Sequence, residues 1–439
     1  MKYLFSTMLI LSAMLWAQGP VSYYGKMQVN GAFIRSPVTN KAMQVKGVSF
    51  FWSQWGDGSR FYNENAVDRM AQDWKAEIVR AAYGSTGYNL SDSAGIVNKE
   101  RIETVVEAAI KNDIYVIIDW HSHSAHEAEE TERAKEFFAY FSEKYGAYDN
   151  VIFELYNEPL NTTWAGIKTY AEQVIPEIRK HSSNLILVGT PYYAQQIETV
   201  IGNAIDDVNL GYVFHFYAAS HSLGSFSGNI AAVQQAKLPV FVTEFGTTNA
   251  DGGNPNACNN ATPPVCVNNY DTHSKTRTDD WLAFFDSRNI SYVAWSISDK
   301  YEGSAFFGET NRSFDQTVPE NWTDTRFMTA SGEYVMNMLQ SSYAKAPWNT
   351  TPILLNSEKA AATGLRASNN MVYIDIANPG NAILNAYSLN GTLLANVFSG
   401  HLSAGSHQFS LNSLPKGVFI LRLSQKNDKT STIFIKKIL

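Results

Sequence analysis

Two glutamates stand where apolar stretches of the sequence end. Glu158 follows a stretch that begins at Val151, and Glu244 follows one that begins at Pro239. A carboxylate at the end of a buried strand lies at the mouth of the sheet, where rigid backbone holds it and a ligand can reach it. Two such carboxylates on neighbouring strands form the acid/base and nucleophile pair of glycoside hydrolysis. The alternative is that each glutamate caps a strand or pairs with a cation.

Eight short apolar stretches rich in β-branched residues recur along the first three quarters of the chain. They lie at 46–50, 77–83, 114–119, 151–156, 185–189, 212–216, 240–244 and 292–296. Segments with helical periodicity separate several of them, as at Asn98–Asn112, Glu129–Tyr145 and Ile167–His181. A strand followed by a helix, repeated eight times, predicts an α/β fold, a (β/α)8 TIM barrel.

The carboxyl ends of barrel strands converge on one rim, whatever their separation in sequence. The predicted rim carries Trp52, Trp55, Arg80, Asp119, Trp120, His121, Asn157, Glu158, Tyr192, Tyr193, His215, Tyr217, Glu244, Trp295, Lys300 and Glu302. Aromatic rings can stack on sugar faces and the polar groups can bond to hydroxyls, whereas a phosphate site would need glycines and lysines. The tryptophans could instead belong to the core. Arg80 interrupts an apolar strand and must be paired when buried, either structurally or with the nucleophile.

A histidine cluster, His121, His123 and His126, raises the possibility of a metal site. The carboxylate partners that such a site needs are not in register with these imidazoles. We therefore predict neither a metal nor another cofactor.

The N-terminus has the composition of a secretory signal peptide. Lys2 precedes an apolar run from Leu4 to Trp16, and the small residue Ala17 follows. That run is too short to span a bilayer, so we expect an exported protein without a membrane span, secreted or at the cell surface. Cys258 and Cys266 lie in a Gly/Asn/Pro-rich stretch, and in an exported protein we expect them to form a disulfide.

Charge divides the chain into two regions. Residues 361–439 carry seven basic and two acidic side chains, a net charge of +5. Because the whole chain carries −7, the rest of the chain carries −12. An acidic main body argues against nucleic acid as a partner. After a Pro-containing stretch at 344–364, short strand-like runs alternate with turn signals and predict a small all-β sandwich at 365–439. The predicted strands are Met371–Ile376, Ala386–Leu389, Gln408–Leu411, Val418–Leu423 and Ser431–Ile438. The predicted organisation is a signal peptide at 1–17, a barrel at 18–343, a linker at 344–364 and the sandwich.

Residues 22–343 resemble glycoside hydrolase family 5, and within it the bacterial cellulases. The resemblance rests on Gly47-Val48-Ser49, Arg80, Asp119-Trp120-His121, Tyr156-Asn157-Glu158-Pro159, His215-Phe216-Tyr217, Thr243-Glu244-Phe245-Gly246 and Trp295–Lys300. It implies a retaining endo-1,4-β-glucanase, expected as a monomer, in which Glu158 is the acid/base and Glu244 the nucleophile.

The same resemblance assigns roles to the other rim residues. Asn157 would contact the sugar 2-hydroxyl, while Arg80 and Tyr217 would orient Glu244. His121 and His215 would line the catalytic subsite. The glycone side of the substrate would lie against Trp55, Trp295, Lys300 and Glu302.

Two positions depart from the family pattern, and the substrate is open to alternatives. Phe51 stands where related cellulases often have histidine, and Tyr193 stands where many have tryptophan, which reduces the stacking surface for the leaving sugar. β-1,4-glucan is the predicted substrate; mannan, xylan, mixed-linkage glucan and a non-catalytic polysaccharide-binding barrel are the alternatives.

The C-terminal segment resembles the sorting domains of type IX secretion. The resemblance rests on Lys416–Leu423 and Thr432–Leu439. It implies recognition by that secretion machinery and passage across an outer membrane. All ten tryptophans lie at or before Trp348, so a cellulose-binding role, the alternative, would depend on Tyr373 and Tyr387.

Overall fold

The computed structural model divides into two units, one within residues 1–350 and one within 351–439. In the first unit it describes residues 19–85, 87–250, 252–253, 274–308 and 322–349. In the second it describes 364–368, 371–376, 379–387, 393–411, 414, 417–425 and 431–437. The predicted signal peptide, most of the predicted linker, and Cys258 and Cys266 lie outside these ranges.

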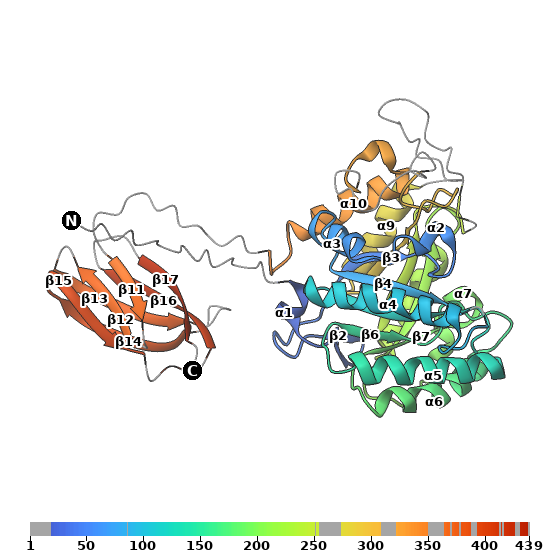
Figure 1. Cartoon of the computed structure of the whole chain (residues 1–439), viewed down its shortest axis with the longest axis horizontal. Helices are drawn as coiled ribbons and strands as arrows, with labels where there is room; N and C mark the ends of the chain where they lie inside the picture. The colour runs from blue at the N-terminus through green and yellow to red at the C-terminus, as the bar shows by residue number, and fades with distance from the viewer. Residues whose placement is uncertain are drawn as a thin grey trace, which may run out of the picture. The chain divides into compact units, whose positions relative to one another are not determined.

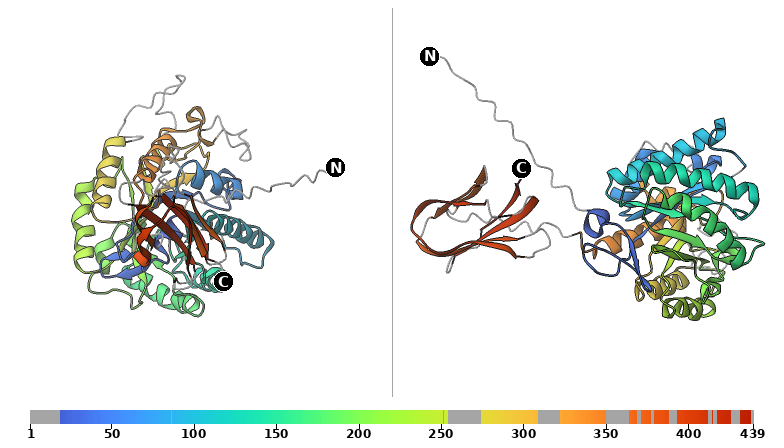
Figure 2. Two further views of the ribbon diagram at one scale, coloured as in Figure 1. Left: turned by 90° about the vertical axis from the view of Figure 1, so that its left-hand side faces the viewer. Right: turned by 90° about the horizontal axis from the view of Figure 1, so that it is seen from below.

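The first unit is a closed barrel of eight parallel strands surrounded by helices (Figures 1 and 2). The strands are β3 (Lys46–Phe50), β4 (Ile78–Gly84), β5 (Tyr115–His121), β6 (Val151–Glu154), β7 (Ile186–Gly189), β8 (Leu210–Tyr217), β9 (Val240–Gly246) and β10 (Tyr292–Ile297). Each follows its predecessor around the barrel, and β10 pairs with β3 to close it. All eight predicted strands are therefore confirmed, and so is the predicted TIM barrel.

Helices fill the connections between strands and bury their apolar faces against the sheet. They are α2 (Gly56–Ser59), α3 (Glu64–Gln72), α4 (Ser93–Lys111), α5 (Ala128–Tyr145), α6 (Trp164–Arg179), α7 (Pro191–Ala194), η1 (Ile197–Val200), α8 (Leu223–Gln235), α9 (Lys275–Asp286), η5 (Thr325–Phe327) and α10 (Ala330–Tyr343). On α4, Ile102, Val105, Val106 and Ala109 are buried, as the periodicity predicts. Across the described ranges, no helix combines the length and apolarity needed to cross a bilayer.

Strand β9 contains a β-bulge, with one residue more than the paired segments of β8 and β10. Between paired positions, β8 advances from Val213 to His215 while β9 advances from Phe241 to Glu244. The register of β9 against β10 shifts in the same region. Such a bulge redirects side chains, which is how adjacent residues of one strand can serve the same site. The strand continues to Gly246, so Glu244 lies within it and not after it as the sequence suggested.

Residues 20–35 pack against the end of the barrel opposite the strand carboxyl ends. Helix α1 (Pro20–Tyr24) precedes an antiparallel pair, β1 (Gln28–Asn30) and β2 (Phe33–Arg35). Tyr24 packs edge-to-face on Trp348, with ring centroids 5.2 Å apart. Because Trp348 is buried in this cluster, packing of the first unit extends beyond the end of α10.

Glu77, just before β4, is a buried carboxyl that should make the barrel's stability depend on pH. Burial raises its pKa to about 8, although the backbone amide of Lys46 donates to it at 3.0 Å. A carboxyl whose folded-state pKa is raised favours folding fully below its unfolded value, and this contribution disappears as pH rises to about 8. We expect Glu77→Gln to remove this loss, which is at most about 5 kcal/mol between pH 4.5 and 8.

The measurement is urea unfolding of both proteins at about pH 5 and pH 8, with exposed Glu132→Gln as the control. Parallel losses of stability in wild type and Glu77→Gln would contradict the prediction.

The second unit consists of two antiparallel sheets that share one core. One sheet contains β11 (Gly364–Ser368), β12 (Met371–Ile376) and β15 (Gly405–Ser410); the other contains β13 (Gly380–Tyr387), β14 (Leu393–Leu402), β16 (Gly417–Gln425) and β17 (Ser431–Lys437). Val372 and Ile374 of the first sheet belong to the same buried cluster as Leu384 and Leu421 of the second. This arrangement confirms the predicted small all-β sandwich.

Candidate active site

A cleft of about 180 Å³ opens at the carboxyl ends of the strands. Nine of the residues predicted for the site line it: Trp55, His121, Asn157, Glu158, Tyr217, Glu244, Trp295, Lys300 and Glu302. Arg80 and His215 are buried and contact the lining carboxylates from below. Tyr193 does not line this cleft. The barrel therefore brings together eleven of the twelve residues predicted for catalysis and substrate binding.

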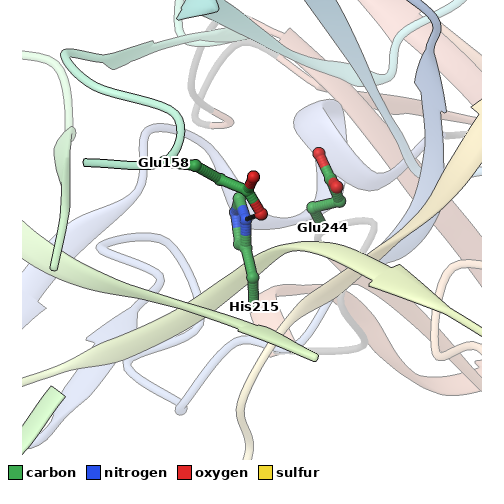
Figure 3. Close-up of side chains that lie close together, drawn as sticks. All are labelled: Glu158, His215 and Glu244. Carbon is green, nitrogen blue, oxygen red and sulfur yellow. Dashed lines mark hydrogen bonds and ion pairs between the residues drawn. The ribbon is translucent and has the colours of Figure 1, made fainter. Parts of the chain in front are cut away.

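The two glutamates face each other across the cleft. One oxygen of Glu158, one oxygen of Glu244 and a ring nitrogen of His215 all lie within 4.8 Å of one another (Figure 3). The Glu158 side chain enters this space from the loop after β6 and the Glu244 side chain from β9, and His215 lies beneath Glu158. Retaining glycosidases hold their carboxyl groups about 5–5.5 Å apart, whereas inverting enzymes need about 6.5–9.5 Å.

Two charged carboxylates at this spacing repel by about 3 kcal/mol in an effective dielectric of about 20. That energy corresponds to about two pKa units. The pair therefore favours the state with a single negative charge. The partners of each carboxyl group decide which one keeps the proton.

Glu244 is surrounded by donors that favour its ionised form. Arg80 Nη1 donates to Oε2 at 3.0 Å, and the Tyr217 hydroxyl donates to Oε1 at 2.8 Å. Burial, and next the Glu158 charge, raise the pKa of Glu244, while Arg80 and Tyr217 oppose this. Burial and the Glu244 charge also raise the pKa of Tyr217 well above its usual value, so it remains a donor. With Glu158 neutral, the negative charge resides on Glu244.

Arg80 is the centre of a fully buried network of carboxylates. Besides Glu244, it contacts Glu154 at 2.7 and 3.3 Å and Asp119 at 2.9 Å. Burial raises the pKa of both Asp119 and Glu154 to about 7, and Arg80 opposes that shift. Its Nη2 also donates to Asn157 Oδ1 at 2.6 Å, which leaves the Asn157 amide NH2 available to a ligand. Arg80 thus makes both the structural ion pair and the link to Glu244 that the sequence left as alternatives.

Among the residues that the structure describes, Glu158 contacts imidazoles and no permanent cation. His215 Nδ1 lies 3.1 Å from Oε1, and His123 Nε2 lies 3.5 Å from Oε2. Burial raises the pKa of Glu158, and hydrogen bonds from His123 and His215 lower it, to about 2. Where His215 is neutral with its hydrogen on Nε2, its Nδ1 lone pair accepts a hydrogen bond from the Glu158 carboxyl group, and burial then favours the acid form of Glu158.

The three histidines of the cluster take different partners. His121 Nδ1 contacts Asp119 Oδ2 at 2.6 Å, and His126 Nδ1 contacts the Tyr156 hydroxyl at 2.7 Å. Burial and the Arg80 charge lower the pKa of His121 well below its usual value, so its ring is neutral. His123 approaches Glu158 instead.

Aromatic side chains form one wall of the cleft. Trp52 and Trp55 stack with centroids 5.4 Å apart, and Trp295 stacks on His121 at 5.2 Å. Trp55 is about half exposed, which leaves a ring face for a sugar. On the same side, Lys300 Nζ contacts Glu302 Oε2 at 2.6 Å and lies 5.3 Å from the centre of the Phe51 ring. Phe51 therefore offers a cation–π contact to Lys300 at the position where related cellulases often have histidine.

Tyr192 and Tyr193 lie after β7 with exposed rings. Both residues and Ala194 have left-handed backbone dihedrals, with φ of 56°, 57° and 56°. Non-glycine residues rarely adopt this conformation, and several in succession are costly. The turn leaves both tyrosine rings exposed to solvent and buries Ala194 in the core.

Two contacting residues were missed from the sequence, Glu154 and Thr243. Glu154 is a charged residue inside the buried strand β6, and Arg80 interrupts β4 in the same way. Opposite charges in nearby buried strands are a signal that could have identified the pair, because an unpaired buried charge is strongly unfavourable. Thr243 offers no comparable signal, since threonine is common in strands.

Comparison with known proteins agrees with this geometry. Residues 37–301 match the model of the family described as cellulase (glycosyl hydrolase family 5). Endoglucanase Z of Dickeya dadantii is 39% identical over 327 residues, covering 73% of this chain and 67% of that protein. Cellulase CelDZ1 of a Thermoanaerobacterium species is 34% identical over 313 residues, covering 67% and 75%.

Solved structures are similar over the barrel. The catalytic domain of a Thermobifida fusca endoglucanase has a TM-score of 0.64 at 28% identity, covering 73% of this chain and 99% of that domain. A structure from Cytophaga hutchinsonii has a TM-score of 0.65 at 33% identity, covering 74% and 97%. On the combined evidence of sequence, fold and cleft, the chain belongs to the cellulases of glycosyl hydrolase family 5.

Proposed function

We propose that the chain hydrolyses internal β-1,4-glucosidic bonds with retention of anomeric configuration. The observation that carries this proposal is the carboxyl pair of Glu158 and Glu244, which have one oxygen each within 4.8 Å of the other. Their hydrogen-bond partners differ: Glu244 contacts Arg80 and Tyr217, and Glu158 contacts His215. The predicted class, an endo-1,4-β-glucanase, agrees with relatives that are endoglucanases and are 31–39% identical.

In the first step Glu244 attacks the anomeric carbon while Glu158 protonates the departing glycosidic oxygen. Arg80 and Tyr217 hold Glu244 by its two oxygens and so orient it. The Asn157 amide, fixed by Arg80, is placed to donate to the sugar 2-hydroxyl, a contact that strengthens in the transition state. The product is a glycosyl ester on Glu244 and a free leaving sugar.

In the second step Glu158, now a carboxylate, takes a proton from water, and that water attacks the anomeric carbon. The bond to Glu244 breaks and its carboxylate is regenerated. Two inversions give net retention. Proton NMR of fresh cellotetraose hydrolysis tests this directly: the β-anomer should appear first, and initial α-anomer would refute the assignment.

The aromatic wall favours a β-linked glucan as substrate. We expect the cleft to accept a glucan chain from both ends, so that internal bonds are cut. We expect more reducing ends from carboxymethyl cellulose than from mannan or xylan, with mixed-linkage glucan as an intermediate case. Preference for mannan would overturn the substrate assignment, and absence of products from every polymer would favour a binding barrel.

We further propose that residues 1–17 direct export and that the C-terminal sandwich serves secretion across an outer membrane. The sequence resemblance at Lys416–Leu423 and the local positive charge support this. Tyr387 Oη accepts a hydrogen bond from Asn385, so this ring is engaged within the sandwich. A full-length chain should be exported by a type IX system and a chain truncated after residue 350 should not. Equal export of the two chains would contradict this role. Loss of cellulose binding on truncation would favour the cellulose-binding alternative.

A further inference from the structure

A continuous series of hydrogen bonds connects Glu158 to Glu244 beneath the cleft. His215 contacts Glu158 at 3.1 Å through Nδ1 and Thr243 Oγ1 at 2.8 Å through Nε2. Thr243 Oγ1 lies 2.6 Å from Glu154 Oε1. Arg80 then joins Glu154 to Glu244 at 2.7 and 3.0 Å. The intervening side chains are all buried, so water does not replace these partners.

The chemistry of each group sets the direction of the series. Arg80 can only donate, and it donates to both Glu154 oxygens, so its positive charge favours the ionised carboxylate, which has no hydrogen to give to Thr243. The single hydroxyl hydrogen of Thr243 points to Glu154, and its lone pair must accept from His215 Nε2–H. A neutral His215 then has a lone pair at Nδ1, and the hydrogen bond to Glu158 requires the proton to come from the Glu158 carboxyl group.

We propose that Thr243 is a positioning residue that holds His215 in its Nε2–H tautomer and thereby keeps the catalytic proton on Glu158. The proposal rests on the proposed function, because it concerns the acid that protonates the leaving sugar. Thr243 does not touch the cleft and acts through His215.

The bulge in β9 makes this arrangement possible. In a regular strand, adjacent side chains point to opposite faces. Here Thr243 contacts His215 and Glu154, while Glu244 contacts Arg80 and Tyr217. The extra residue between the paired positions of β9 thus allows one strand to supply both the nucleophile Glu244 and Thr243, which orients His215.

Other charged groups around His215 do not replace this contact. Glu158 faces Nδ1, and Glu154 lies 3.9 Å from Nε2, beyond hydrogen-bond distance. Asp119 and Glu244 lie close enough to interact electrostatically with His215, but among the described residues neither carboxylate makes a hydrogen bond to its ring. Without the Thr243 hydroxyl, His215 can carry its hydrogen on Nδ1, where it stabilises ionised Glu158 and lowers the pKa of that group.

The test compares substrates that differ in their need for an acid. Thr243→Val keeps the shape of the side chain and removes the hydroxyl. We expect kcat/KM for cellotetraose to fall roughly tenfold or more, a part of the 10²–10⁴ that acid–base catalysis contributes. For dinitrophenyl β-cellobioside, whose leaving group needs no proton, kcat/KM should change less than about twofold. In the pH dependence of kcat/KM for cellotetraose, the alkaline limb of Thr243→Val should lie at lower pH than that of the wild type.

Two variants control for structural effects. Thr243→Ser retains a hydroxyl and should recover most of the lost kcat/KM for cellotetraose. Thr278→Val removes a buried hydroxyl on α9 that donates to the backbone carbonyl of Ser274, outside the cleft. It should leave the ratio of the two kcat/KM values at the wild-type value. Urea unfolding of each variant reports whether the barrel remains intact.

An equal loss on both substrates, no loss on either, or an unmoved alkaline limb would overturn the role of Thr243. Failure of the proposed function would look different: the wild-type enzyme itself would give no product or the inverted anomer.

Discussion

Glu244→Gln is expected to lower kcat on carboxymethyl cellulose on the order of 10⁴-fold or more, because the amide cannot form the glycosyl ester. Glutamine is isosteric, so its oxygen can still accept from Arg80, and the Tyr217 hydroxyl can turn to accept from the new NH2 group. The barrel should therefore stay folded. Reducing-end assays and urea unfolding on the same preparations measure the two effects.

The matched control for Glu244 is Glu130→Gln on α5, another buried carboxyl with an arginine partner, Arg133, but outside the cleft. It should retain near-normal turnover. A second measurement uses Glu244→Gly with azide, which can enter the space left by the side chain and should give the glycosyl azide of inverted configuration. Near-normal kcat in Glu244→Gln would show that Glu244 is not the nucleophile.

Glu158→Gln should show a loss that depends on the leaving group. For cellotetraose, loss of the general acid is expected to lower kcat/KM about 10²–10⁴-fold. For dinitrophenyl β-cellobioside, the first step needs no acid, but the second still needs the base. Stopped-flow absorbance should therefore show a rapid burst of dinitrophenolate followed by slow turnover, because the glycosyl ester on Glu244 accumulates.

Azide distinguishes this role from general damage to the cleft. It is already an anion and needs no base, so it should accelerate the slow phase of Glu158→Gln and yield the glycosyl azide of retained configuration. Equal losses on both substrates without a burst would mean that Glu158 is not the acid/base.

Much of the architecture could be predicted from the sequence. Parallel strands covered on both faces read as continuous apolar stretches, and eight of these appear in order. Because such strands are all parallel, the residues after them meet at one rim. Glu158, Trp55 and Lys300 could thus be assigned to one site although they are remote in sequence. In the C-terminal sandwich, the turn signals predicted β12 with its observed bounds, Met371–Ile376.

Other features depend on neighbours that a linear sequence does not display. Strand β14, Leu393–Leu402, was not predicted, because its alternation is weak and its pairing with β13 includes register shifts. The structure likewise ends β6 at Glu154, before the predicted 156, so Glu158 lies on the following loop.

The sequence by itself determined which chemistry the rim can perform, since residue type and position at a strand end suffice for that. Only the tertiary structure decided how the protons are distributed. Arg80 has three carboxylate partners, and the bulge in β9 brings Thr243 and Glu244 to the same network. The direction of each hydrogen bond depends on which donors and acceptors meet, and residues from different strands meet only when the barrel closes.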